Sequence, residues 1–329
     1  MSEKLASGRR LLTVWAGVSL IVCSSLPPLS ALFAQENGTQ PAPQKSGEKP
    51  AEPEATAPQP VQVSPEAVAL LEEARKQLRS YRSIKADLTE TVLFGPQTFR
   101  AEGSYLQGSD SEILFEFRLT IDGADGKPLI GRLLEVCNGQ ILWMSYQVGA
   151  DLQVTRRDIG QIMQAAKESP SIDSELLTSQ LGLGGISGLL ASMQRSMAFE
   201  SISLETVDGN QYQMIDGGWS AEYLEKLKPS GAGENFVLPN YVPDRVRIFF
   251  DEKSKFPRRI LYLKTIEGKS RPMLALDFFN VQTNVPIANE TFVFTLRKDV
   301  IPQDITQDVI AQIRAASAQP ATPPEKPKE

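Results

Sequence analysis

The chain contains no histidine, and this absence removes several classes of function. Histidine is the commonest general base, the usual partner of a serine or cysteine nucleophile, and the commonest metal ligand. The sequence therefore excludes a catalytic triad, a histidine-bound metal site and a histidine proton relay. Carboxylate chemistry remains, but its one cluster, Asp122 and Asp125, lies in a stretch that predicts a turn. We expect no enzyme, no cofactor and no metal.

Cysteine and clustered positive charge are also scarce. The two cysteines are Cys23, in a segment that we expect to be removed, and Cys137. An internal disulfide is then excluded, and we expect Cys137 to be a small buried apolar residue. With 34 Lys and Arg against 40 Asp and Glu, the net charge is −6. Because phosphate binding needs clustered cations, we expect no nucleic-acid partner.

Residues 1–34 have the pattern of an export signal. Lys4, Arg9 and Arg10 precede the apolar run "LLTVWAGVSLIVCSSL", and small residues near Ala31 and Ala34 suit cleavage. The run is short for a membrane-spanning helix and is followed by two prolines, although an uncleaved inner-membrane anchor stays open. We expect a periplasmic protein.

The composition divides the remainder into three parts. Residues 35–63 are rich in Pro, Glu, Lys and Gln and poor in residues that pack, which predicts a disordered linker. Residues 314–329 have the same composition and predict a disordered tail. The predicted folded domain is 64–313, with no internal repeat.

The folded domain begins with one amphipathic helix and continues as strands. Ser64 is a good N-cap and Pro65 suits the first helical position, and Val68, Leu71 and Leu78 follow at helical spacing. Alternating apolar and polar residues then predict about ten to eleven antiparallel strands, among them 84–94, 113–121, 273–281 and 291–297. Asn138-Gly139 predicts a two-residue type I′ hairpin. A short helix is expected over 220–227.

A sheet of this size must curl or close, because twist accumulates from strand to strand. The fold class is therefore α+β, mainly antiparallel β, a half-open curled barrel whose concave face needs a cover. Residues 158–197 predict helices for this role. Within them, "SELLTSQLGLGGISGLLASMQR" (174–195) combines leucines with Gly182, Gly184, Gly185 and Gly188. Each glycine lowers helix propensity by roughly 1 kcal/mol. The segment is either a hinged lid over an apolar ligand or a plug that fills the sheet.

Three stretches resemble the periplasmic lipoprotein-carrier and outer-membrane lipoprotein-sorting family (LolA-like). "CNGQILWMSY" (137–146) is similar to the family's "DGKxLWxY" hairpin, and "DFFNVQTNVPIANETFVFTLRKDV" (277–300) to its closing pattern. The opening order of a helix, "IKADLTETV" and a strand through Gly103 also matches. The resemblance implies a half-open barrel with 158–197 as its lid, and an apolar cavity that receives acyl chains of lipoproteins.

The leading hypothesis is a monomeric, non-enzymatic envelope protein that carries or senses lipids or lipoprotein acyl chains, with membrane-bound donor or acceptor proteins as further partners. The alternative is a regulatory or scaffolding protein with a filled barrel that binds a protein partner. The candidate cavity is lined by Phe115, Phe117, Leu119, Leu134, Val136, Leu142 and Met144, and capped by Leu181, Leu183, Ile186 and Leu190. The sequence does not determine which face of each strand points inward.

Overall fold

The computed structural model describes residues 63–94, 97–108, 112–122, 128–169, 177–178, 181–228, 236, 238–239 and 242–318. The predicted signal peptide and all but the last residue of the predicted linker lie outside these residues. The helices of the described part are α3 (Pro65–Ser80), α4 (Ile159–Lys167), α6 (Gly185–Ser196), α7 (Ala221–Leu227), α8 (Thr306–Ala318) and the 3₁₀ helix η1 (Asn289–Phe292).

The strands form one sheet, in the order β12-β6-β5-β4-β3-β2-β1-β11-β10-β9-β8-β7. Their bounds are β1 (Ile84–Phe94), β2 (Gln97–Gln107), β3 (Glu112–Asp122), β4 (Pro128–Asn138), β5 (Ile141–Val148), β6 (Asp151–Asp158), β7 (Met197–Val207), β8 (Asn210–Trp219), β9 (Arg245–Asp251), β10 (Pro257–Ile266), β11 (Lys269–Thr283) and β12 (Gln303–Asp304). All pairs are antiparallel except β12 with β6.

Two runs of hairpins make this sheet, one from β1 to β6 and one from β7 to β11. Pairing of β1 with β11 joins them at the centre. Strands β6 and β7, which are joined in sequence by residues 159–196, consequently lie far apart in the sheet order. The connecting segment therefore has to pass from one side of the sheet to the other, and within it α6 packs on one face.

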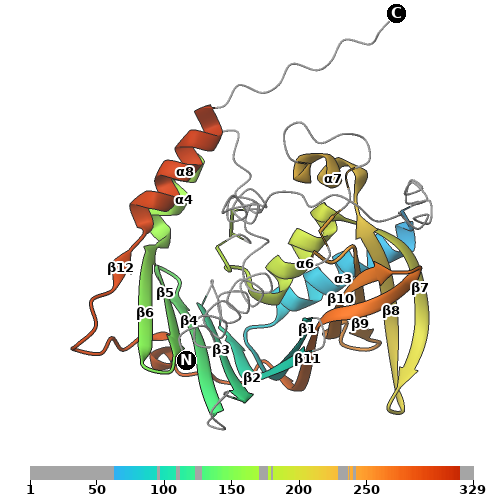
Figure 1. Ribbon diagram of the computed structural model, residues 1–329, viewed down its shortest axis with the longest axis horizontal. Coiled ribbons are helices and arrows are strands. Elements are labelled where there is room, and N and C mark those ends of the chain that lie inside the picture. The colour runs from blue at the N-terminus through green and yellow to red at the C-terminus, as the bar shows by residue number, and fades with distance from the viewer. Residues whose placement is uncertain are drawn as a thin grey trace, which may run out of the picture.

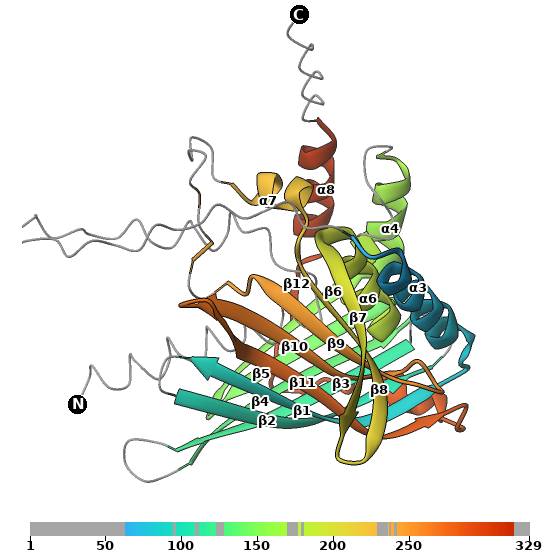
Figure 2. The ribbon, with the colours of Figure 1, turned by 90° about the vertical axis from the view of Figure 1, so that its right-hand side faces the viewer.

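The sheet is curled into a half-open trough, and α3 and α6 lie inside it (Figures 1 and 2). We call the face against which they pack the concave face. Among the described strands, β7 and β12 end the sheet and do not pair with each other, so the barrel is not closed. The predicted fold class is confirmed, and the sheet of the described residues has twelve strands where about ten to eleven were expected.

Helix α3 forms where the sequence predicts it. The Ser64 hydroxyl accepts a hydrogen bond from the Ala67 amide at 3.2 Å, and Pro65 occupies the first turn. Leu71 and Leu78 are almost fully buried beneath the helix. Each such leucine contributes about 1.5–3 kcal/mol to stability, so tertiary burial rather than propensity holds α3 on the sheet.

The buried side chains form two clusters. The main cluster lies between the concave face, α3 and α6, and includes Phe117, Leu88 and Leu190. A second cluster lies at the β6 side, where α4 packs against α8, and includes Cys137. Figure 1 shows these two helices together above β6, separate from α3 and α6.

The expected strand over 291–297 is wrong. Residues 289–292 form the 3₁₀ helix η1, and 293–297 have no ladder partner among the described residues. The segment 289–300, here called the strap, instead crosses the other face of the sheet, the convex face. After η1 its apolar residues alternate, because an extended chain presents successive side chains to opposite sides: Val293 is 62% exposed, whereas Phe294 is half-buried.

Two further expectations need correction, and one is confirmed. The hairpin after β4 is present, but only Gly139 has a positive φ, of 84°, so a type I′ turn is wrong. Helix α8 extends beyond residue 313, where the sequence analysis ended the folded domain. The short helix expected over 220–227 is α7, and the Ser220 hydroxyl caps it by accepting a hydrogen bond from the Tyr223 amide. No helix of the described residues has the length and apolar character needed to cross a membrane.

Candidate ligand-binding interior

Helix α6 covers the concave face together with α3. Its side chains Ile186, Leu190 and Met193 are buried in the main cluster. Opposite them, β3 contributes Phe115 and Phe117, whose rings meet edge to face at 4.6 Å between centroids. The interface between helix and sheet is therefore largely apolar.

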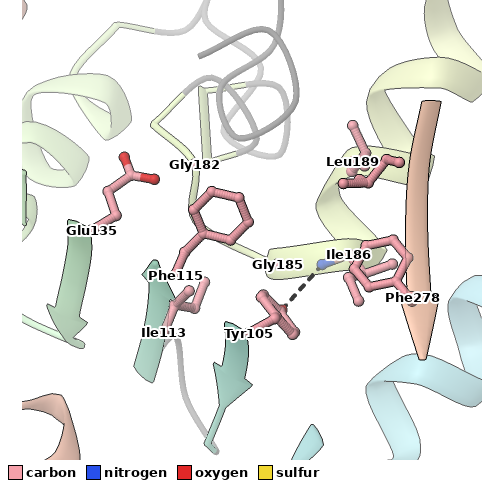
Figure 3. A pocket seen from close by; sticks show the side chains of 10 residues that line it. Tyr105, Ile113, Phe115, Glu135, Gly182, Gly185, Ile186, Leu189 and Phe278 are labelled. Atoms are coloured by element: carbon pink, nitrogen blue, oxygen red, sulfur yellow. Dashed lines mark hydrogen bonds between the residues drawn. The ribbon is translucent and has the colours of Figure 1, made fainter. Parts of the chain in front are cut away.

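The N-terminus of α6 is capped by the sheet rather than by its own sequence. Its N-cap residue is Gly184, with a φ of 88° and no side-chain hydrogen bond. The Tyr105 hydroxyl of β2 accepts a hydrogen bond from the Ile186 amide at 3.2 Å (Figure 3). It donates one to Gln107 Oε1 at 2.6 Å. Because early helical amides lack partners within the helix, this tyrosine satisfies one that would otherwise be unpaired.

Gly185 allows this close approach. Its φ is 56°, and a Cβ atom there would overlap the Tyr105 hydroxyl and lie 2.6 Å from Gln107 Oε1. A larger residue would push the start of α6 away from β2. The glycines that lower helix propensity thus permit a left-handed entry turn that lies directly on the sheet.

The other end of α6 is held by several polar contacts. Ser196 is followed directly by β7, and its carbonyl accepts from the Ser220 amide at 2.9 Å. Gln194 accepts from Arg75 at 2.5 Å and donates to Glu72 at 3.2 Å, both on α3. Helix α6 is thus anchored at its C-terminal end, and its N-terminal end is held by the hydrogen bond to Tyr105 and by apolar contacts.

We expect Tyr105→Phe to loosen the N-terminal end of α6. Loss of the hydroxyl leaves the Ile186 amide without its partner, at a cost of about 1 kcal/mol. Hydrogen exchange of the first amides of α6 should then become about fivefold faster, while exchange in the sheet stays unchanged. The control is Tyr81→Phe, which removes a hydroxyl that donates to the Ser254 carbonyl at 3.4 Å. Equal exchange in both variants would show that Tyr105 does not hold α6.

A small cavity of about 40 Å³ lies beneath the N-terminal part of α6. Sheet side chains and the glycine-rich entry of α6 surround it, as Figure 3 shows. The lining consists of Tyr105, Ile113, Phe115, Glu135, Gly182, Gly185, Ile186, Leu189, Leu276 and Phe278. This volume is close to that of one water molecule, so the closed interior has no room for an acyl chain.

Charged side chains also lie on the concave face. Glu135 borders the cavity and is 5% exposed, and Glu90 on β1 is fully buried. Burial lowers the pKa of Arg157 on β6, and the nearby Glu135 carboxylate opposes that change. The interior is therefore apolar around α6 and carries opposite charges toward β6.

The structure divides the predicted site residues into three groups. Phe115, Phe117, Leu119, Ile186 and Leu190 belong to the main cluster, and Met144 packs against it. Leu142, Leu181 and Leu183 belong to the second cluster, with α4 and α8. The assignment of Leu134 and Val136 to the cavity is wrong. These residues pair with Glu116 and Leu114, which alternate along β3 with Phe115 and Phe117, and they therefore lie on the convex face.

Sequence reasoning missed several residues that line the cavity. Leu276 and Phe278 come from β11, which lies beside β1 although nearly two hundred residues separate them. Glu135 was missed because a polar side chain in an alternating strand is normally assigned to the exposed face. Tyr105 follows the apolar alternation of 98–106, but the sequence did not show that this face of its strand borders a cavity. Knowledge of the pairing of β1 with β11 would have identified the first two residues.

No cluster of three potential metal ligands occurs among the residues that the structure describes. Asp125 and the side chain of Asp122, the one carboxylate cluster considered from the sequence, lie outside them.

Comparisons with known proteins give distant structural similarities. No family model and no curated protein sequence matches the chain. LprF from Mycobacterium bovis is 14% identical, with a TM-score of 0.36 over 69% of this chain and 96% of that one. A putative outer membrane lipoprotein-sorting protein domain from Vibrio parahaemolyticus is 8% identical, with a TM-score of 0.31 over 69% and 96%.

MucB of Pseudomonas aeruginosa, solved in complex with MucA, is 11% identical, with a TM-score of 0.29 over 72% of this chain and 67% of that one. The matches include the family that the sequence resembles. Their TM-scores and identities are too low to carry an argument about function, and the fold described above rests on the topology of this chain.

Cys137 is buried, as expected, and we predict that it is inert in the folded protein. Burial raises the pKa of its thiol to about 11. At pH 8 its thiolate fraction is then about two orders of magnitude below that of an ordinary thiol. Alkylation followed by peptide mapping should show slow modification of Cys137 in the native protein and fast modification after denaturation. Rapid modification without unfolding would contradict this assignment.

The same shift predicts a pH dependence of stability. Above about pH 8.5 the unfolded chain loses the thiol proton first, so the unfolded state binds fewer protons than the folded state. This contribution to the free energy of unfolding therefore declines as the pH rises through 9 toward 11.

Proposed function

We propose that this chain is a non-enzymatic, monomeric protein of the bacterial periplasm that binds a lipid or the acyl chains of lipoproteins. The ligand lies between the concave face and α6, as cargo of a carrier or as the signal of a sensor. Membrane-bound donor or acceptor proteins are the further partners. The proposed contacts are Phe115, Phe117, Leu119, Met144, Ile186 and Leu190, with Tyr105, Ile113, Leu276 and Phe278 added by the structure.

The observation that carries this proposal is the unequal attachment of α6. Its C-terminal end continues into β7 and bonds to α3, whereas its N-terminal end begins in a turn with Gly182, Gly184 and Gly185 at positive φ. Such a turn suits a hinge, because glycine changes backbone conformation at little cost. Apolar surfaces that separate in water then need an apolar ligand between them, since their exposure costs about 25 cal/mol per Å².

Binding requires α6 to move. The cavity of about 40 Å³ holds no acyl chain, so the described conformation is the closed one. Displacement of the N-terminal end of α6 breaks the bond to Tyr105 and separates Ile186 and Leu189 from Phe115 and Phe278. The hydrocarbon chain of the ligand then replaces these contacts, and the closed conformation is the ligand-free state.

The small cavity also favours a second candidate function. If α6 never leaves the concave face, the barrel is filled and α6 is a plug. The chain is then a regulatory or scaffolding protein of the envelope, and its ligand is a protein partner.

Native mass spectrometry distinguishes the two functions. The exported protein is purified from a bacterial periplasm without detergent, and its mass is measured before and after organic extraction. A bound mass that extracts as a two-chain lipid or an acylated peptide supports the lipid-binding function. An unliganded mass that is unchanged after incubation with phospholipid vesicles overturns it and favours the filled barrel.

A further inference from the structure

A second hollow lies on the convex face, outside the proposed interior. It is a groove of about 330 Å³ between strands β3 to β6 and the strap. Its lining from the sheet is Leu114, Arg132, Leu134, Val136, Ser145, Gln147, Leu152 and Val154, and from the strap Thr291, Val293, Phe294, Thr295, Leu296, Arg297 and Val300. Exposed Val293 places the groove in contact with solvent.

The strand register gives the floor of the groove a polar and an apolar end. Arg132 on β4 pairs with Gln147 on β5, which pairs with Leu152 on β6, so the two polar side chains share one row with a leucine. The next row contains Leu134, Ser145 and Val154, and the row after it begins with Leu114 and Val136. An occupant with one charged end and one hydrocarbon end fits this gradient.

The strap covers the groove, and contacts beside the groove hold it on the sheet. Phe294 stacks on Trp143, with 5.1 Å between ring centroids and 13° between planes. Phe292 is buried, and beyond the strap Asp304 of β12 accepts from Arg156 at 2.7 Å. Because these contacts hold the strap on the sheet, the hollow beneath it is a feature of the folded chain.

The charged side chains of the lining are two arginines, each paired with a carboxylate that lies outside the lining. The lining itself contains no carboxylate. Arg132 donates through Nε to Glu116 at 2.9 Å, and among the described residues its Nη atoms make no hydrogen bond, so its guanidinium keeps donors for a second acceptor. Arg297 is paired with Asp299 on the strap. An arginine presents several donors in a planar fork that suits a carboxylate.

We propose that this groove binds a single long-chain carboxylate, a free fatty acid, with its hydrocarbon chain over Leu134 and Val136 and its carboxylate at Arg132. A cavity of about 150 Å³ holds benzene, so about 330 Å³ has room for roughly a dozen carbon atoms. That room accommodates one chain and excludes a two-chain lipid. The inference does not depend on the proposed function, because the groove and the interior lie on opposite faces of the sheet.

Fluorescence quenching by 12-bromododecanoate tests this site, because Trp143 lies beside it on the convex face. The chain has three tryptophans, and the substitutions W15F and W219F leave Trp143 as the fluorophore in the full-length protein. We expect saturable quenching of Trp143. Arg132→Gln should weaken binding about tenfold, through loss of a charge-assisted hydrogen bond. The second measurement is the calorimetric titration of dodecanoate into the protein that retains all its tryptophans.

The matched control is Arg118→Gln. Arg118 pairs with Arg132 in the ladder and also lies near Glu116, but it does not line the groove. Its substitution should leave the affinity within about twofold. Binding without quenching of Trp143, equal losses in the two arginine variants, or equal affinity for dodecyltrimethylammonium would each overturn the proposal. Failure to find a two-chain lipid by native mass spectrometry affects none of these measurements.

Discussion

Replacing Gly103 with alanine is expected to lower the free energy of unfolding by about 3 kcal/mol, the upper part of the range for overpacked cores. Gly103 lies on β2 between Leu88 of β1 and Phe117 of β3. A Cβ atom there would overlap the Glu116 carbonyl oxygen and lie 2.8 Å from Cδ1 of Phe117. The absence of a side chain lets the fully buried Phe117 ring lie over the strand.

The obstacle at Gly103 includes backbone, so rotation of a side chain cannot relieve it. Either β2 separates from β3, or Phe117 leaves its position in the main cluster. For a domain of this size the loss corresponds to a decrease in Tm of roughly 6–12 °C. Thermal unfolding followed by circular dichroism measures it.

Gly160→Ala is the matched control. Gly160 is exposed in α4, and the nearest atom to an added Cβ is Asp158 Oδ1 at 3.4 Å. The same chemical change should there raise the free energy of unfolding by about 0.5–1 kcal/mol, because alanine favours the helix. Similar shifts in Tm for both variants would contradict the role given to Gly103.

The elements of this fold could be predicted from local pattern, whereas their long-range arrangement could not. Alternation identified the strands, and Ser64-Pro65 identified the start of α3, because both depend on neighbours in sequence. The pairing of β1 with β11 depends on which distant strand completes the sheet, and no local signal encodes it. The strap was mistaken for a strand because an extended chain packed on a sheet has the same period of two.

The candidate site was only partly predictable for a related reason. In "LIGRLLEVC" both faces of β4 carry apolar residues, because α6 and its neighbours cover one face and the strap covers the other. The alternation of residues along β4 therefore cannot show which of its faces is the concave one. Because the charged Glu135 alternates with Leu134 and Val136, the sequence favoured these two apolar residues as the inward-facing ones. The register with β3 decides the matter, since Phe117 lies opposite Leu133.

Leu190→Asp is expected to reduce lipid retention at least tenfold while the sheet remains folded. Leu190 is fully buried in the middle of α6. An isolated carboxylate at this position costs several kcal/mol as long as α6 stays in place. If α6 is a hinged lid, displacement into water relieves this cost, because its N-terminal end has a glycine-rich entry and the tie to Tyr105. The cost is then limited to the free energy that separates the closed and open states.

Three measurements on this variant separate a lid from a plug. Organic extraction gives the lipid retained per protein, hydrogen exchange reports α6, and circular dichroism reports the sheet. A lid predicts loss of lipid and fast exchange in α6, with the sheet melting within a few degrees of the unsubstituted protein. The control Leu190→Met keeps volume and polarity nearly constant and should retain the lipid. A variant that loses the sheet together with α6 would show that the helix is a permanent part of the core, because only then does the buried charge destabilise the whole domain.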